Sequence, residues 1–313
     1  MILRKNRFGK KTTGGTVISI IDDRMQLDTL ELKLDRSHQA VHLRFLHPGR
    51  PVFSWQLLED FSASQDIISN LCAQDARLPQ EQRLKYMVVS SAMPDVFVLG
   101  GDLALFLELI RAGDRQGLIR YAHRCTDLLY RNLSGGDGDL CSITLIEGEA
   151  LGGGFELAVA ADLIIAEKRA RFGFPELQFG LFPGMGAFSL LARRVNPALA
   201  KRLITSGRLY SAEELYEMGV VDLLAEDGHA HELLHHYIRK RQPREGGYAA
   251  VDTIVDEHNP VTREELVRIV DLWVETALTL GSKNLTMMEY LLKAQYKRWG
   301  KDSSTATVSR LRA

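Results

Sequence analysis

The chain has 313 residues, of which 45% are hydrophobic and 25% are charged, and its formal net charge is −1 at pH 7. This length allows one large domain or one domain with an appendage, and the composition is typical of a soluble globular protein. The small net charge gives no support for nucleic-acid binding through bulk electrostatics.

Membrane and secretion signals are missing from the sequence pattern. No apolar run reaches the roughly 18 residues that a spanning helix needs, and no apolar segment follows the basic start. The three cysteines have neither the close spacing of a zinc site nor the even number of a disulfide framework. We therefore expect a cytoplasmic protein with no membrane span and no metal.

Short strands and longer helices alternate along the chain. Runs of β-branched or alternating apolar residues predict strands at residues 17–21, 29–34, 40–46, 86–91, 142–146, 162–166 and 219–222. Apolar residues at helical spacing predict a helix at 54–73, two helices split at Gly113-Asp114, and a strongly helical stretch from 262 to 299. The alternation indicates an α/β fold.

The pattern divides the chain into four parts. Residues 1–16 form a basic extension that we expect to be flexible, and 17–241 form the core. A Pro/Gly-containing break at residues 242–247 precedes a C-terminal helical region at 248–300. Residues 301–313 form a frayed tail.

Two glutamates lie twenty residues apart beside glycine-rich turns. Glu156 follows the run Gly152–Gly154 at the start of a predicted helix, and Glu176 follows Pro175. Glycines before a helix let backbone N–H groups approach a ligand, and two carboxylates beside such donors suit proton transfer next to a stabilised oxyanion. Each acid taken alone could simply be a favourable helix-start residue.

A second glycine turn, Gly100-Gly101-Asp102, lies between a predicted strand and helix. Together with Gly153, it could supply one N–H group each to a thioester carbonyl oxygen. A tight turn alone would also explain these glycines. Four histidines, by contrast, lie on a polar predicted helix without supporting acids, and we expect a solvated face for His229, His231, His235 and His236.

At these motifs the chain resembles the crotonase (enoyl-CoA hydratase/isomerase) superfamily. The two glycine turns, the two glutamates, the Pro183-Gly-Met-Gly186 turn and the segment 205–222 occur in the family's order. Within the superfamily the chain is most similar to bacterial synthases of the diffusible signal factor, a cis-2-unsaturated fatty acid used in quorum sensing. This closer resemblance is carried by residues 95–106, 150–156, 181–187 and 272–277.

The resemblance implies a spiral of β-β-α units with a C-terminal helical region, a homotrimer or hexamer, and no cofactor. Gly101 and Gly153 would form the oxyanion hole, and Glu156 and Glu176 the acid/base pair. The implied substrate-binding residues are Gly100, Leu151, Gly152, Met185, Trp273 and Leu291. The last three could instead be ordinary core residues.

The implied reaction is dehydration of a medium-chain 3-hydroxyacyl thioester, followed by hydrolysis to the free cis-2-enoic acid. The carrier would be acyl carrier protein or CoA, and a sensor kinase is an implied partner. Two alternatives stay open: an ordinary enoyl-CoA hydratase, and a catalytically silent crotonase-fold protein that binds an acyl ligand or a partner.

Overall fold

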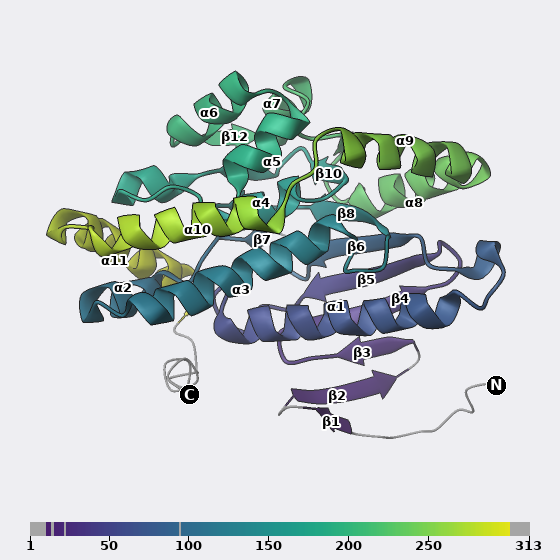
Figure 1. Ribbon diagram of the computed structural model, residues 1–313, viewed down its shortest axis with the longest axis horizontal. Coiled ribbons are helices and arrows are strands. Elements are labelled where there is room, and N and C mark those ends of the chain that lie inside the picture. Colours follow the sequence, from purple (N-terminus) through teal and green to yellow (C-terminus); the bar gives the residue numbers. More distant parts are fainter. Residues whose placement is uncertain (1–10, 14–15, 22, 94, 301–313) are drawn as a thin grey trace.

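The computed structural model describes residues 11–13, 16–21, 23–93 and 95–300. Residues 1–10 of the expected extension and the expected tail lie outside these ranges (Figure 1). The strands are β1 (Lys11–Thr13), β2 (Thr16–Ile21), β3 (Arg24–Gln26), β4 (Leu30–Asp35), β5 (Ala40–Phe45), β6 (Tyr86–Ser91), β7 (Val96–Val98), β8 (Cys141–Ile146), β9 (Glu149–Leu151), β10 (Leu163–Glu167), β11 (Arg171–Gly173), β12 (Leu209–Ser211) and β13 (Leu223–Ala225). The helices are α1 (Trp55–Asp75), α2 (Leu103–Ala112), α3 (Arg115–Leu133), α4 (Gly153–Val159), α5 (Ala187–Arg194), α6 (Pro197–Thr205), α7 (Ala212–Glu217), α8 (Ala230–Arg241), α9 (Glu245–His258), α10 (Arg263–Leu278) and α11 (Ser282–Trp299), with 3-10 turns η1 (Gln80–Gln82), η2 (Pro175–Phe179) and η3 (Gln242–Arg244).

The larger sheet of the described residues has the strand order β1-β2-β3-β4-β5-β6-β8-β10-β13. Its first five strands form an antiparallel meander, and its parallel half begins where β5 pairs with β6. The buried parallel strands alternate their side chains between two faces, as the pleat requires. Met87 and Val89 of β6 face the core that includes α1, whereas Tyr86 and Val88 face α8.

The smaller sheet has the order β12-β11-β9-β7. Its strands β7, β9 and β11 run parallel, so their carboxyl ends meet at one edge. The turns that leave this edge carry Gly100-Gly101, Gly152-Gly153 and Glu176. Three segments far apart in the sequence therefore converge on one place.

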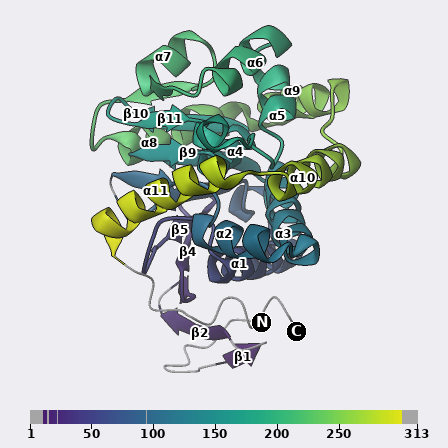
Figure 2. The same cartoon turned by 90° about the vertical axis from the view of Figure 1, so that its left-hand side faces the viewer.

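The C-terminal helices α10 and α11 pack against earlier helices of the chain. Figure 2 shows α10 and α11 lying between the α2–α3 pair and the region of α4 to α7. The α10 helix packs on α3, and α11 contacts both α2 and η2. A buried Trp273 on α10 packs edge-on against Phe106 of α2, with ring centroids 5.0 Å apart.

Most predicted elements are confirmed, but the strand at 219–222 is wrong and the break at 242–247 is shorter than predicted. Residues 219–222 form a turn, because the Asp222 carboxylate accepts the Ile164 N–H and forms an ion pair with Arg194. The strand begins only at Leu223. The expected break at 242–247 is instead a 3-10 turn that leads directly into α9, with Gly246 and Gly247 inside the helix. No helix of the described residues is both long and apolar enough to cross a membrane.

Candidate active site

Glu156 lies in the first turns of α4 with only 2% of its surface exposed. Its Oε1 atom accepts the N–H groups of Met185 at 2.7 Å and Ala187 at 3.0 Å. Met185 belongs to the Pro183-Gly-Met-Gly186 turn and Ala187 follows it, and Gly186 between them has a φ of 116° that favours glycine. The Pro183-Gly-Met-Gly186 turn therefore holds the Glu156 carboxylate in place.

Glu176 follows Pro175 in η2 and is only partly buried as a residue. Its Oε2 atom is nevertheless closed off from solvent, and among the described residues it has no hydrogen-bond partner. The backbone of Gly152 runs directly against this carboxylate, since a Cβ built on Gly152 would overlap Oε1. Gly152 also has a φ of 51°, so both geometry and space favour glycine there.

The environments of the two carboxylates differ. Burial raises the pKa of Glu156 to about 7, although its backbone hydrogen bonds partly oppose that shift. Burial and the neighbouring charge of Glu156 raise the pKa of Glu176 to about 8. The N–H groups of Met185 and Ala187 favour the charged form of Glu156, so near neutral pH a proton on the pair resides preferentially on Glu176.

The two glycine turns present N–H groups side by side. Gly153 is the first residue of α4, so its N–H has no acceptor within the helix. In the other turn, Phe53 N–H donates to the Gly100 carbonyl, while among the described residues the N–H of Gly101 has no acceptor. A Cβ on Gly100 would lie 3.3 Å from the Gly153 nitrogen, so the two turns are in contact. This arrangement can bind an oxyanion.

A cavity of about 310 Å³ opens beside both glutamates and both turns. Five of the six expected substrate-binding residues line it: Gly100, Leu151, Met185, Trp273 and Leu291. Gly152, the sixth, is not in the lining and contacts Glu176 instead. The volume lies at the lower end of the usual range for ligand pockets, roughly 300–1,000 Å³.

The cavity wall is mostly apolar and comes from several helices. Its apolar lining away from the two glutamates includes Leu103, Phe106, Tyr121, Ala122, Cys125, Val270, Phe179 and Leu181. Its polar lining includes Glu149 and Arg298, whose side chains are partly exposed and form an ion pair at 3.1 Å. The site therefore combines two carboxyl groups, two N–H donors and an apolar chamber with a charged rim.

Comparisons of the sequence and the fold with known proteins agree with this geometry. Residues 62–266 match the family model described as enoyl-CoA hydratase/isomerase. The chain belongs to this family.

Among curated relatives, a probable mitochondrial enoyl-CoA hydratase 2 of Arabidopsis thaliana is 32% identical over 155 residues, which are 49% of this chain and 48% of the relative. The fatty acid oxidation complex subunit alpha of Vibrio parahaemolyticus is 32% identical over 154 residues, which are 49% of this chain and 21% of the relative. The chain thus matches about half of one relative and about a fifth of the other.

Solved structures share the fold. An enoyl-CoA hydratase from Bacillus halodurans has a TM-score of 0.69 at 19% identity, with 84% of this chain and all of that chain covered. Pseudomonas aeruginosa DspI has a TM-score of 0.59 at 25% identity, with 81% and 98% covered. The expected α/β crotonase-type fold is confirmed.

A buried ion pair beside the Gly100-Gly101 turn of this enoyl-CoA hydratase/isomerase family member was not predicted. The side chain of Arg50 is 1% exposed and donates to Asp102 at 2.8 Å. Asp102 caps α2 by accepting the N–H groups of Ala104 and Leu105. The partners of Arg50 are far away in sequence, so no local motif signals the pair.

Arg50 also reaches the C-terminal helix. It donates to the Gln295 side chain at 3.2 Å, and its guanidinium lies 5.0 Å from the centroid of the Tyr296 ring. Nearby, the buried Tyr121 hydroxyl accepts the Asp102 N–H and donates to the Phe53 carbonyl. These contacts tie the residue after Gly101 to both α3 and α11.

Proposed function

We propose that the chain dehydrates a medium-chain 3-hydroxyacyl thioester to the cis-2-enoyl thioester and then hydrolyses it to the free acid, as a diffusible signal factor synthase does. The observation that carries this proposal is the shared cavity, in which Glu156 and Glu176 lie beside an apolar chamber. A chamber lined by Phe106, Ala122 and Trp273 offers a fatty acyl chain contacts that a short polar acid would not use.

The proposed dehydration uses each part of the site. The thioester oxygen accepts the N–H groups of Gly101 and Gly153 while the Glu176 carboxylate removes the C2 proton. The resulting enolate expels the 3-hydroxyl group, which leaves as water with a proton from the Glu156 carboxyl. The C2–C3 double bond forms as the C3–O bond breaks, and the pair ends with its proton on Glu176.

That final state is the one that the surroundings favour, because burial beside Glu156 raises the pKa of Glu176. It is also the state from which water addition to a double bond would start, with Glu156 as the base and Glu176 as the acid. The preferred protonation state therefore supports an ordinary enoyl-CoA hydratase as the second candidate.

The proposed hydrolysis reuses the same groups. Water donates a proton to the Glu156 carboxylate and attacks the thioester carbon, while Gly101 and Gly153 bind the oxyanion. The new C–O bond replaces the C–S bond, and the proton leaves with the carrier thiol. A homotrimer or hexamer, a sensor-kinase partner and a cytoplasmic location stay predictions.

Mass spectrometry of the acids released from 3-hydroxydodecanoyl carrier protein and from the matching CoA thioester tests this proposal. We expect free dodecenoic acid from wild type, none from Glu156→Gln or Glu176→Gln, and wild-type yield from Glu108→Gln, whose side chain lies exposed on α2. Hydration of enoyl-CoA without any free acid would refute the synthase and favour the hydratase. Full acyl binding by all variants without turnover would favour the silent binding protein.

A further inference from the structure

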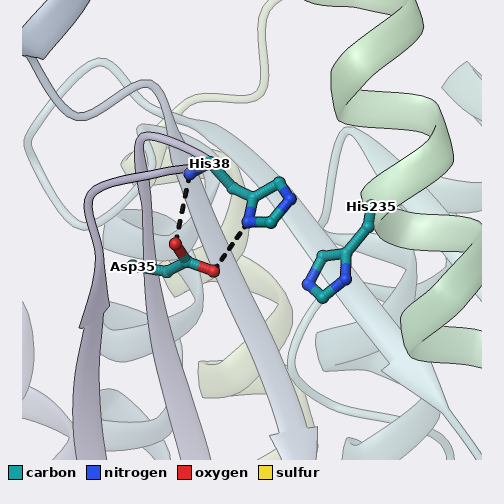
Figure 3. A group of neighbouring side chains, drawn as sticks. All are labelled: Asp35, His38 and His235. Carbon is teal, nitrogen blue, oxygen red and sulfur yellow. Dashed lines mark hydrogen bonds and ion pairs between the residues drawn. The ribbon is translucent and has the colours of Figure 1, made fainter.

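A second cluster of chemistry-bearing side chains lies at the end of the larger sheet, between the β4–β5 turn and α8. Asp35 ends β4, His38 lies in the turn, and His235 projects from α8 toward them (Figure 3). All three are partly buried, and each offers one ligand atom, with these atoms within 4.8 Å of one another. The expectation that His235 belongs to a solvated face without acids is therefore wrong.

The order along α8 explains why one histidine reaches the cluster. His231 and His235 are four residues apart in the run His-Glu-Leu-Leu-His, a spacing that places both on one helix face. The intervening Glu232 is exposed and pairs with His229 at 2.9 Å, away from the cluster. A protease-like role for this run is excluded, because its acid does not face the histidine pair.

Asp35 is held in a fixed orientation. Its Oδ1 accepts the Ser37 hydroxyl at 2.6 Å and the His38 N–H at 3.1 Å, and its Oδ2 lies 2.8 Å from His38 Nδ1. These hydrogen bonds hold Oδ2 toward the His38 ring.

The two imidazoles are stacked, with ring centroids 4.1 Å apart and planes 9° from parallel. His42 and His231 contribute to the same electrostatic environment without being in ligand position. One carboxylate and two imidazoles are the donor set that zinc and its neighbours prefer.

We propose that Asp35, His38 and His235 bind one first-row transition-metal ion, with Zn²⁺ as the preferred occupant and water as its fourth ligand. The ion would replace the proton between Asp35 Oδ2 and His38 Nδ1. Tetrahedral zinc bonds of about 2.0–2.1 Å place ligand atoms roughly 3.3 Å apart, so that pair must open slightly. His235 must turn out of the stack, because parallel ring planes cannot both contain the ion.

Such a site would fasten the β4–β5 turn to α8. The α8 side chains Ala230, Leu234 and Ile238 already cover one face of the parallel strands. A metal bridge at the edge of this face would oppose separation of the helix from the sheet. The proposed role is structural and does not depend on the proposed reaction.

The test is a calorimetric Zn²⁺ titration of the tag-free, chelator-treated full chain, with thermal unfolding in parallel. We expect one equivalent bound by wild type, an increase of Tm with Zn²⁺, and at least tenfold weaker binding by Asp35→Asn, His38→Gln and His235→Gln. The control is His236→Gln, an exposed neighbour on α8, which should bind like wild type.

The Cu²⁺ spectrum gives an independent readout of the ligands. Electron paramagnetic resonance should show nitrogen coupling in wild type that weakens in both histidine variants and persists in His236→Gln. Circular dichroism of each variant without metal verifies folding. If one of the three ligand variants does not fold, the other two still test the proposal. Absence of stoichiometric Zn²⁺ binding, or equal affinity in wild type, His38→Gln and His235→Gln, would overturn the proposal.

Discussion

Replacing Arg50 by methionine tests whether the buried ion pair positions the Gly100-Gly101 turn. Removing one partner of a buried pair typically costs about 3–5 kcal/mol, because the remaining charge stays buried. Asp102 would keep its two N–H donors on α2, so we expect about 3 kcal/mol, the lower end of that range. At about 2 °C per kcal/mol for a chain of this size, Tm should fall by roughly 6 °C.

The same change should slow turnover. Asp102 directly follows Gly101, and even a 1 Å misplacement of a catalytic group can cost about a hundredfold. We expect kcat to fall by roughly 10- to 100-fold with a smaller change in KM, measured under conditions where the variant is fully folded. Arg50→Met/Asp102→Asn should recover part of the lost stability, because it removes the unpaired charge.

Arg111→Met is the matched control. Arg111 also pairs with a glutamate on α11, Glu289, but the two side chains are 53% and 36% exposed. Surface pairs contribute at most about 1 kcal/mol, so Tm and kcat should stay close to wild type. If Arg50→Met leaves Tm and kcat unchanged, or if Arg50→Met and Arg111→Met lower them equally, the positioning role of Arg50 is refuted.

Three further predictions concern the glutamate pair. Because the proposed dehydration needs one proton on the glutamate pair, kcat/KM should fall below about pH 7, where the pair gains a second proton, and above about pH 8, where it loses its last one; a flat profile over this range would contradict the assignment. The pKa of Glu176 is raised in the folded chain. The free energy of unfolding should therefore fall as the pH rises from the ordinary pKa of a glutamate, 4.5, to about 8. Glu176→Gln should therefore unfold at higher urea than wild type in alkali and at similar urea in acid. Gly152→Ala should lower kcat at least tenfold and lower Tm, since its Cβ would overlap the Glu176 carboxylate at a positive φ, whereas Gly246→Ala in open space on α9 should not.

Local patterns predicted much of the fold. The six residues of β6, four of them apolar, form a strand with the predicted bounds, and α3 begins after Asp114, at the predicted split between two helices. Errors arose where long-range contacts decide the structure. Asp222 ends a turn because it binds Ile164 and Arg194, and neither contact can be read from neighbouring residues.

In the candidate site, too, local motifs could be predicted from the sequence and long-range contacts could not. Glu156 and Gly153 share one contiguous motif, so sequence alone places them together. Arg50 was missed because its partners, Asp102 and Gln295, belong to distant helices. The cluster of Asp35 and His235 was missed for the same reason, since the acid comes from the first sheet strands and the histidine from α8.

Deuterium incorporation at C2 tests the central claim most directly, namely that the glutamate pair moves a C2 proton beneath the two glycine N–H groups. Purified chain and a cis-2-enoyl thioester in D₂O should yield a 3-hydroxyacyl thioester with one deuterium at C2, detected by mass spectrometry, because the reverse reaction delivers a solvent-derived proton to C2. The label should disappear with Glu176→Gln and persist with Glu108→Gln. Formation of product without C2 label, or undiminished label in Glu176→Gln, would contradict the account.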